Sequence, residues 1–242
     1  MKNGTLYSEL ASLCANFYDH LIDAKSVADF VEKRISRFHP KELLFIGGFF
    51  SVAKELEKRG YSLTVIDYTD EMAAEARKRL PGTRIIKADI RNLPFRNEFD
   101  AVLAIGRVFT HMGSDEDAKK ALQSMKAALK QGGILLFDNY EDTKIGKTPY
   151  FTDVVKVKKG DSEIVRTSSL VTLSKNHYLW KSDYEFKEGK EKKIFHDEME
   201  HRAFSRNEIR NVLVENGLAF IEDGDNFDET SFYTLAKLVP KT

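Results

Sequence analysis

Two adjacent glycines and a later aspartate have the spacing of a ribose-binding βα unit. Gly47 and Gly48 follow the apolar run 43–46, and Asp67 ends a second apolar run about twenty residues further on. A carboxylate at the end of a second strand can accept hydrogen bonds from both hydroxyls of a cofactor ribose. We therefore predict a ligand site over the ends of these two strands, with Asp67 as the ribose acceptor. The alternative is that Asp67 only caps the helix expected over 70–80.

Two further polar residues follow later apolar runs. Asp89, together with a backbone amide beside it, can hydrogen-bond the edge of an adenine; the alternative is a turn built by Asp89 and Asn92. His111 lies just beyond the apolar run 99–105. An imidazole titrates near neutrality, so His111 can orient or deprotonate an amine nucleophile. The alternative role, a hydrogen-bonding loop residue, is equally open.

A third cluster of polar residues, from His196 to His201, invites a metal-site hypothesis. The two histidines are an odd number of residues apart in a segment with strand character. Side chains at that spacing point to opposite faces of a strand. The pattern therefore favours a solvated charged strand, and we predict no metal site.

The elements that must position these residues alternate in type along the chain. Apolar runs typical of strands cover 41–46, 62–67, 83–88, 99–105 and 133–138, and helical patterns cover 50–59, 70–80 and 115–130. Such alternation indicates a parallel sheet covered on both faces. Residues 150–203 instead alternate apolar with polar, which is typical of an antiparallel meander. A helix over 206–216 and strands at 218–223 and 231–239 complete the pattern.

These elements predict an α/β fold: a Rossmann-like, seven-stranded, mostly parallel sheet with helices on both faces and an antiparallel β insertion after strand five. Residues 1–40 form an N-terminal helical cap, with helices at 5–20 and 24–38. Residues 41–145 and 204–242 form the α/β core, and 146–203 form the inserted meander. Its aromatic residues are expected either to cover the mouth of the site or to form a homodimer face; they are Tyr178, Trp180, Tyr184 and Phe186.

Composition narrows the classes of partner. The 242 residues include 38 Lys plus Arg and 38 Asp plus Glu, so the formal net charge is zero. This balance argues against nucleic acid or an anionic membrane as a partner bound through bulk positive charge. No stretch approaches the ~18 apolar residues of a membrane span. The single cysteine, Cys14, cannot form an internal disulfide, which is consistent with a reducing compartment. We predict a cytoplasmic protein.

Several segments resemble, in order and spacing, the motifs of class I S-adenosylmethionine-dependent methyltransferases. They read VIDYTDEM, ADIRNLPFRNEFDAVLAIG, ALKQGGILLF and FSRNEIRNVLVENGL. The early NFYDHLI, the β-rich insertion and HDEMEHRAFSRNEIRNVLVENGLAF are similar, more narrowly, to small-molecule N-methyltransferases, including those that dimethylate amino sugars. The resemblance implies S-adenosylmethionine as cofactor and a small-molecule methyl acceptor, methylated at nitrogen in preference to oxygen.

The resemblance also implies a role for each matching residue. Gly47 and Gly48 would wrap the methionine part of the cofactor, and Asp67 would bind the ribose with Tyr68 beside the adenine. Asp89 and Ile90 would bind the adenine, Ile105 and Gly106 would flank the sulfonium, and 107–111 would face the substrate. Tyr18 matches a tyrosine that closes over the site in related enzymes. Tyr18 and His111 are the expected substrate contacts.

The first loop departs from the family pattern. Phe45 stands where the family has an acid, and Phe49 and Ser51 replace two glycines. The two rings of Phe49 and Phe50 could turn into the helix–sheet interface, or the cofactor could bind in a shifted pose. A third alternative is that they fill the pocket, which leaves a catalytically inactive protein that uses the fold for binding or assembly. A nicotinamide-dependent dehydrogenase is a weaker alternative because the Gly-x-Gly-x-x-Gly motif is absent.

Overall fold

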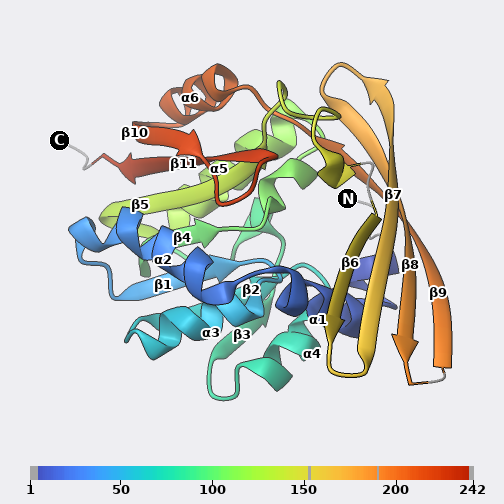
Figure 1. Cartoon of the computed structure of the whole chain (residues 1–242). Coiled ribbons are helices and arrows are strands. Elements are labelled where there is room, and N and C mark those ends of the chain that lie inside the picture. The colour runs from blue at the N-terminus through green and yellow to red at the C-terminus, as the bar shows by residue number, and fades with distance from the viewer. Residues whose placement is uncertain (1–4, 152–153, 190, 240–242) are drawn as a thin grey trace.

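The computed structural model describes residues 5–151, 154–189 and 191–239. Its main sheet contains β1 (Glu42–Ile46), β2 (Ser62–Asp67), β3 (Arg84–Lys87), β4 (Phe99–Ala104), β5 (Leu129–Tyr140), β10 (Leu218–Asp225) and β11 (Ser231–Leu238). The spatial order is β10-β11-β5-β4-β1-β2-β3 (Figure 1). Strands β1 to β5 pair in parallel, and β11 is antiparallel to both of its neighbours. The predicted seven-stranded, mostly parallel sheet is confirmed.

The helices of the described residues that flank this sheet are α1 (Ala11–Leu21), α2 (Ala24–Ile35), α3 (Phe50–Lys58), α4 (Asp70–Arg79), α5 (Asp115–Ala128) and α6 (Arg206–Glu215). Short 3₁₀ turns lie between other elements: η1 (Thr5–Tyr7), η2 (Ser36–Phe38), η3 (Ile90–Asn92), η4 (Val108–His111) and η5 (Pro149–Phe151). The first predicted helix, 5–20, is not continuous: it is divided into η1 and α1, and the Leu6 N–H of η1 donates to the Asp197 carboxylate. Helix α5 ends two residues before the predicted 130, because Leu129 already pairs with β4.

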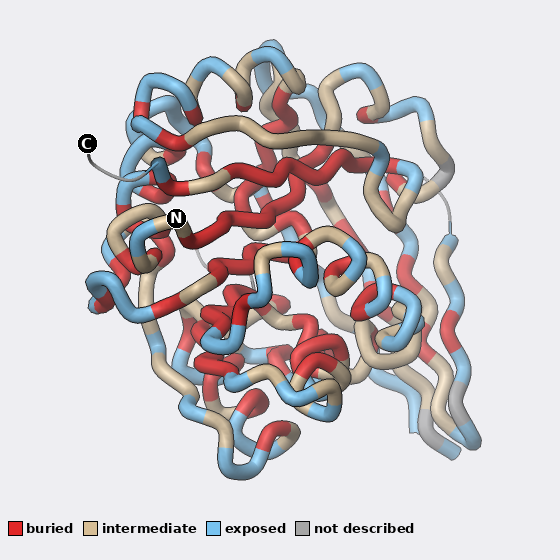
Figure 2. Tube along the Cα trace, turned by 90° about the vertical axis from the view of Figure 1, so that its left-hand side faces the viewer, coloured by how far each residue is buried: buried red, intermediate tan, exposed pale blue. Residues whose placement is uncertain are grey.

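Alternation along each strand divides the core into two layers. Leu43 and Phe45 of β1 pack with helices α1 to α4, whereas Leu44 and Ile46 pack with α5 and α6 on the other face. All four are nearly or fully buried. Figure 2 shows the buried segments running along the central strands, with exposed turns around them. Burial on both faces explains why these strands read as continuous apolar runs.

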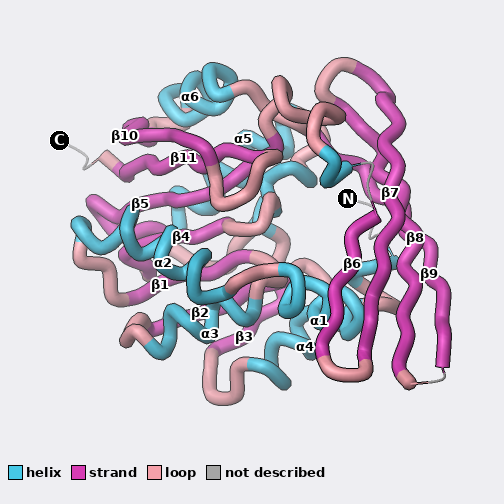
Figure 3. The backbone as a smooth tube through the Cα atoms, viewed as in Figure 1, coloured by secondary structure: helices cyan, strands magenta, loops and turns pink. Residues whose placement is uncertain are grey.

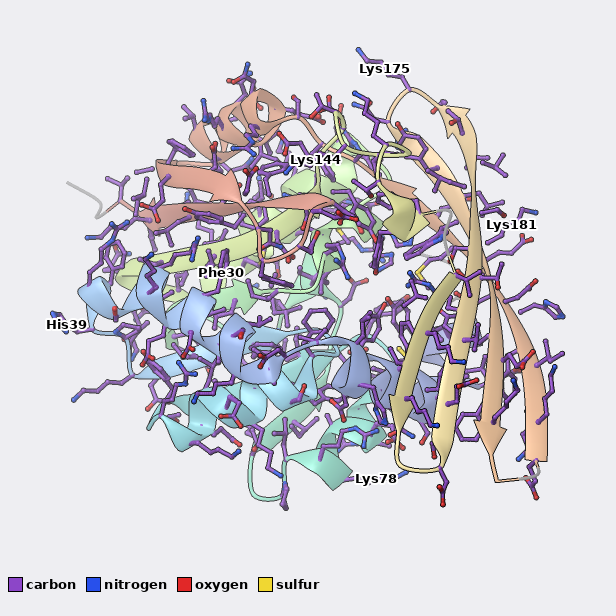
Figure 4. All side chains as sticks on the ribbon, viewed as in Figure 1. Phe30, His39, Lys78, Lys144, Lys175 and Lys181 are labelled. Atoms are coloured by element: carbon purple, nitrogen blue, oxygen red, sulfur yellow. The ribbon has the colours of Figure 1, made fainter. Side chains whose placement is uncertain are left out.

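The meander forms a second, antiparallel sheet of β6 (Val154–Lys159), β7 (Ser162–Ser174), β8 (His177–Glu188) and β9 (Glu191–Arg202), paired in that order. It stands beyond the ends of the parallel strands in Figures 1 and 3, inside the predicted 146–203 segment. Its outer face is polar: Lys181 points away from the main sheet in Figure 4 and pairs with Glu198. Its inner face carries buried residues such as Arg166, Trp180 and Tyr184. The inner face therefore forms a wall against the loops of the main sheet.

Within the described ranges, no helix combines the length and apolar character needed to cross a membrane.

Candidate active site

A cavity at the carboxyl ends of the parallel strands brings together nine of the ten residues predicted for the site. They are Tyr18, Gly47, Gly48, Asp67, Tyr68, Asp89, Ile90, Gly106 and His111. We call this space the outer cavity. Its empty volume, solvent at the mouth included, is about 850 Å³. The tenth residue, Ile105, is fully buried in the hydrophobic core and does not line the cavity.

The glycines of the outer cavity are required by close contacts as well as by backbone conformation. Gly47 has φ +109°, and a Cβ there would lie 2.5 Å from Cγ2 of Val108. A Cβ on Gly48 would lie 2.8 Å from Cε of Met72. Residues with a side chain rarely adopt the backbone conformation of Gly47. A Cβ at either glycine would also force the neighbouring side chain to move. The backbone of this loop is therefore left bare beside the cavity.

Asp67 has a partly buried carboxylate with no cationic partner among the residues that the structure describes. Its Oδ1 accepts hydrogen bonds from the backbone N–H groups of Tyr68 and Thr69, at 2.7 and 3.4 Å. Burial raises its pKa to about 6, against the effect of those two bonds. The N-cap of α4 is Thr69, whose hydroxyl accepts from the Met72 N–H. The alternative role of Asp67 as the helix cap is therefore not realised, and its carboxylate remains available to a ligand.

Asp89 also lines the outer cavity, but its carboxylate is already engaged by protein groups. Arg91 donates to it from Nε at 3.0 Å, from Nη2 at 2.6 Å and from its backbone N–H at 2.8 Å. Burial alone would raise the pKa of Asp89, yet these bonds hold it below its ordinary value. The same backbone bond caps η3. The structure thus realises the predicted turn and leaves the adenine-binding role of Asp89 and Ile90 a prediction.

The two phenylalanines of the first loop do not line the outer cavity. Phe49 is 4% exposed; its ring packs over Gly106 and lies 5.2 Å from the ring of Tyr18. Phe50 is 1% exposed and belongs, like Phe45, to the core between the sheet and helices α1 to α4. Both rings have turned into the helix–sheet interface, the first of the alternatives considered above. The space over Gly47 and Gly48 stays open.

A second, narrower space lies between the outer cavity and the meander, and we call it the inner chamber. Tyr7, Tyr18, Gly106, His111 and Met199 line both spaces. The inner chamber is otherwise lined by polar and aromatic side chains that include Arg107, Tyr140, Trp180, Tyr184, Asp197 and His201. A molecule in the outer cavity and one in the inner chamber would therefore meet at a seam formed by Tyr18, Gly106 and His111.

The turn after β4 is fixed in place by Asp138, at the end of the neighbouring strand β5. The carboxylate of Asp138 accepts the backbone N–H groups of Gly106 at 3.1 Å and Arg107 at 2.6 Å, and also the amide of Asn226. Arg107 holds a left-handed conformation, φ +64°, which is strained for a residue with a side chain. Its guanidinium bonds Asp228 at 3.0 Å and the hydroxyl of Tyr150 at 3.2 Å. This network holds the turn from which Arg107 and His111 line the inner chamber. That residues 107–111 face the substrate stays a prediction.

His111 is a neutral imidazole at physiological pH. Burial lowers its pKa to about 4, despite a hydrogen bond with the backbone of Glu200. Its ring lies 4.9 Å from that of His201 and 5.8 Å from that of Tyr7. His201 is also buried, which lowers its pKa, and its Nδ1 lies 3.1 Å from the hydroxyl of Thr110. A neutral ring with one nitrogen bonded to a carbonyl can offer the other as a hydrogen-bond acceptor.

The two histidines of the last meander strand lie on opposite faces, as predicted. His196 is exposed and bonds Asp183, whereas His201 is buried in the inner chamber. No group of three His, Cys, Asp or Glu side chains suited to a metal ion occurs among the described residues. The predicted absence of a metal site stays a prediction.

Sequence reasoning missed several residues that line or support these two spaces. Asp138, which holds the turn beside them, ends an apolar strand just as Asp67 does, and that signal could have identified it. Tyr7 and Met199 had no such signal, because their placement depends on how the N-terminal segment and the meander dock. The hydroxyl of Thr69 donates to the Tyr7 carbonyl at 2.6 Å, and Asp197 accepts from Leu6, so both contacts join segments far apart in sequence.

The known proteins whose sequences this chain resembles are named as methyltransferases. Residues 47–137 match the family model described as a methyltransferase domain. A glycine/sarcosine N-methyltransferase from Parasynechococcus marenigrum (strain WH8102) is 33% identical over 139 residues, which cover 51% of this chain and 49% of that protein. A putative methyltransferase, YqeM, from Bacillus subtilis (strain 168) is 26% identical over 187 residues, covering 76% of this chain and 62% of that protein. The chain spans about half the length of the glycine/sarcosine N-methyltransferase it matches.

Solved structures extend the similarity to nearly the whole chain. An S-adenosylmethionine-dependent methyltransferase from Clostridium acetobutylicum superposes with a TM-score of 0.78 at 18% identity, over 96% of this chain and 99% of that one. The amino pentose methyltransferase CalS10 from Micromonospora echinaspora gives 0.74 at 19% identity, over 90% and 92% of the two chains. At these identities the likeness establishes the fold.

Proposed function

We propose that this chain is a class I S-adenosylmethionine-dependent methyltransferase that transfers a methyl group to a nitrogen atom of a small molecule. The observation that carries this proposal is the pair of adjoining spaces. The outer cavity lies over the glycine loop and Asp67, the inner chamber lies under the meander, and the two share a seam at Tyr18, Gly106 and His111.

The outer cavity fits an adenosyl cofactor in three respects. Gly47 and Gly48 line the cavity and carry no side chain, so a ligand can approach the backbone of this loop closely. Asp67 offers a carboxylate that no cation of the described residues engages, and a ribose diol supplies two donors for it. The rings of Phe49 and Phe50 stay outside the lining. S-adenosylmethionine, when bound, supplies an electrophilic methyl group.

The residues of the seam would align the acceptor and remove its proton. His111 is neutral and can accept a hydrogen bond from an amine at the boundary of the two spaces. Tyr18 lines both spaces, and its ring is held by Phe49 and Phe17. Arg107 presents its side chain to the inner chamber from the turn that Asp138 fixes. In-line methyl transfer depends mainly on such alignment, so a strong base is not required.

The meander and the N-terminal segment would exclude water from the seam. Met199 of β9 and Tyr7 of η1 line both spaces, and the Leu6 N–H joins β9 through Asp197 at 3.0 Å. A dry site strengthens each polar contact within it. Trp180 and Tyr184 line the inner chamber, which favours the covering role expected of the meander aromatics. A homodimer through the meander stays a prediction.

Nitrogen is proposed as the methylated atom on two grounds. Curated relatives are named as N-methyltransferases, and a neutral imidazole faces the seam as an acceptor for an N–H donor. The acceptor is proposed as a small molecule because the inner chamber is enclosed by side chains from several elements.

The test is a methyl-transfer assay with S-adenosylmethionine labelled in its methyl group and a panel of small primary and secondary amines. The expected result is transfer of label to one class of amine with release of S-adenosylhomocysteine. A reaction without protein gives the background, and a His111→Asn variant, expected to be roughly tenfold to hundredfold slower, shows how much of the transfer depends on the seam. Binding of S-adenosylhomocysteine without transfer to any nitrogen, oxygen or carbon acceptor would favour the inactive alternative.

A further inference from the structure

The inner chamber contains a buried carboxylate that no cation of the described residues neutralises. Asp197 of β9 is 6% exposed and lines the chamber. Its Oδ1 accepts the Leu6 N–H at 3.0 Å, and no Lys, Arg or His nitrogen within the described residues forms an ion pair with it. Burial raises the pKa of Asp197, against the effect of the Leu6 bond. A buried charge is costly unless it is paired, so this carboxylate favours a cation from outside the chain.

The basic side chains that line the chamber do not supply that cation. Arg107 is the arginine of the lining, and its guanidinium is already paired with Asp228 at 3.0 Å. His111 and His201 are neutral, because burial lowers the pKa of each ring. The charge of Asp197 is therefore left uncompensated among the described side chains around this space.

A second buried arginine lies outside the lining of both spaces. The guanidinium carbon of Arg166 is 4.6 Å from the centroid of the Tyr150 ring and 4.7 Å from that of Trp180. Neither the outer cavity nor the inner chamber includes Arg166, and it is not among the groups that shift the pKa of Asp197. It therefore leaves the carboxylate unpaired.

The register of the meander places Asp197 among polar and aromatic side chains of the same face. Ser182 pairs with Asp197 across β8 and β9, and Trp180 pairs with Met199. Alternation along β8 puts Tyr184 on that face as well, and all five residues line the chamber. Hydroxyl oxygens can accept hydrogen bonds from an ammonium group, and the face of an aromatic ring attracts it. The wall around Asp197 therefore suits an alkylammonium group.

The separation of Asp197 from the seam sets the length of a ligand that reaches both. His111 bonds the backbone of Glu200, which is three residues from Asp197 along β9. At the rise of a strand, these backbone positions are about 10 Å apart. Met199 lies between them in sequence and lines both spaces. A molecule with one nitrogen at His111 and another at Asp197 therefore needs a linker of several carbons, which would pass Met199.

We propose that the methyl acceptor carries a second, non-reacting ammonium group and that Asp197 binds it, which makes the acceptor a small linear diamine. The reacting nitrogen lies at the seam beside His111, and the ammonium group donates to the Asp197 carboxylate in a charge-assisted hydrogen bond. This inference rests on the proposed function for the identity of the ligand as methyl acceptor. Binding of an ammonium group at Asp197 does not itself depend on methyl transfer.

The test compares three ligands that share a four-carbon chain with one amine and differ at its other end. Putrescine bears a second ammonium group there, butylamine ends in a methyl group, and 4-aminobutanoate ends in a carboxylate. Each is titrated calorimetrically into the full-length protein at constant pH and ionic strength, with and without S-adenosylhomocysteine. The expected result is saturable binding of putrescine, roughly tenfold or more tighter than that of butylamine, with 4-aminobutanoate the weakest. Trp180 is the only tryptophan of the sequence and lines the chamber, so its emission reports entry of the ligand there.

Two variants locate the ammonium site. Asp197→Asn removes the charge but keeps an oxygen that can accept the Leu6 N–H. It is expected to weaken putrescine binding roughly tenfold to hundredfold and to leave butylamine binding nearly unchanged. Glu198→Gln is the matched control, because it removes the same charge from the next residue of β9, which is exposed and pairs with Lys181. Its affinity for putrescine is expected to stay unchanged.

The outcomes separate this inference from the proposed function. The ammonium site is overturned, even if methyl transfer is observed, by equal wild-type affinities for putrescine and butylamine, by tighter binding of 4-aminobutanoate, or by no saturable binding of putrescine. Unchanged putrescine binding in Asp197→Asn would overturn it as well. Putrescine binding that depends on Asp197 and changes the emission of Trp180 would support it even if transfer fails. If Asp197→Asn does not fold, the three wild-type titrations still decide.

Discussion

The outer cavity and the inner chamber are built in different ways. The outer cavity uses backbone and short-range motifs: glycines at Gly47 and Gly48, and a carboxylate at a strand end, Asp67. The inner chamber uses long side chains from η4, β5, β8 and β9, held by contacts between distant segments such as Arg107 with Asp228. A cofactor that a whole family shares can be bound by a loop that recurs from one relative to another. An acceptor particular to one protein needs side chains that vary from one relative to another.

The same contrast explains how the altered first loop is tolerated. Phe45 and Phe49 stand where the family has an acid and a glycine, and Phe50 follows them; all three side chains turn into the core rather than the cavity. The loop keeps glycine only where a Cβ would collide or where φ is positive, at Gly47 and Gly48. The residues that depart from the family pattern are therefore ones whose side chains can be buried in the core, away from the cavity.

The largest expected effect is a loss of cofactor binding after a substitution in the outer cavity. Asp67→Asn should weaken S-adenosylhomocysteine binding about a hundredfold, because two charge-assisted bonds from the ribose become neutral ones. Isothermal titration calorimetry of the two proteins measures the change. The midpoint of chemical denaturation should stay nearly the same, because an Asn side-chain oxygen can still accept the N–H groups of Tyr68 and Thr69. Unaltered binding of S-adenosylhomocysteine would contradict the ribose assignment.

A pH dependence follows from the same carboxylate. The pKa of Asp67 is raised to about 6 by burial, and the ribose hydroxyls would bind its ionised form. Cofactor affinity should therefore be full above pH 7 and should fall as pH decreases through about 6, since the proton must then leave before binding. Asp67→Asn should remove this dependence. Affinity that is constant from pH 7 to pH 5 in the wild-type protein would contradict the assignment.

The next largest effect is expected on the rate of methyl transfer, after a substitution at the seam. His111→Asn should lower kcat roughly tenfold to hundredfold while cofactor affinity stays nearly constant, because His111 acts on the acceptor. The pKa of His111 is lowered to about 4, so it is neutral across the assay range. The pH profile of kcat above pH 6 should then have the same shape in both proteins. A new limb near pH 6.5 in the wild type would show that His111 titrates there.

The smallest expected effect is on stability, and it distinguishes two reasons why a position needs glycine. One is a clash between a side chain and its neighbours, and the other is a positive φ. Gly47→Ala combines a positive φ with a Cβ contact of 2.5 Å, whereas Gly60, at φ +93°, has open space around it. Gly60→Ala should cost about 1 kcal/mol of unfolding free energy for strain alone. Gly47→Ala should cost about 2 kcal/mol or more and should also weaken cofactor binding. Chemical denaturation measures both; equal costs would remove the steric argument.

Features of the fold that depend on residues close together in sequence could be predicted, and features that depend on contacts between distant segments could not. The resemblance to class I methyltransferases and the seven-stranded sheet are confirmed, because apolar strand runs and ordered motifs are local signals. The same signals brought nine predicted residues to one cavity. Ile105 did not join them, since strand alternation directs its side chain into the core.

The inner chamber was mostly beyond reach of the sequence. Met199 reaches the chamber beside Trp180 through the register of β8 with β9, and Tyr7 arrives through a turn that replaces the first part of a predicted helix. A one-residue shift in register would place every side chain of a strand on its other face. Such pairings follow from the packed fold, not from spacing along the chain.

Calorimetric titration of the wild-type protein with S-adenosylhomocysteine tests the central claim most directly, namely that the space over Gly47 and Asp67 admits an adenosyl group. The account predicts saturable binding to one site per chain that competes with S-adenosylmethionine and disappears, or nearly so, in Asp67→Asn. The absence of heat with either compound at millimolar concentration would contradict it and would leave the fold without its cofactor.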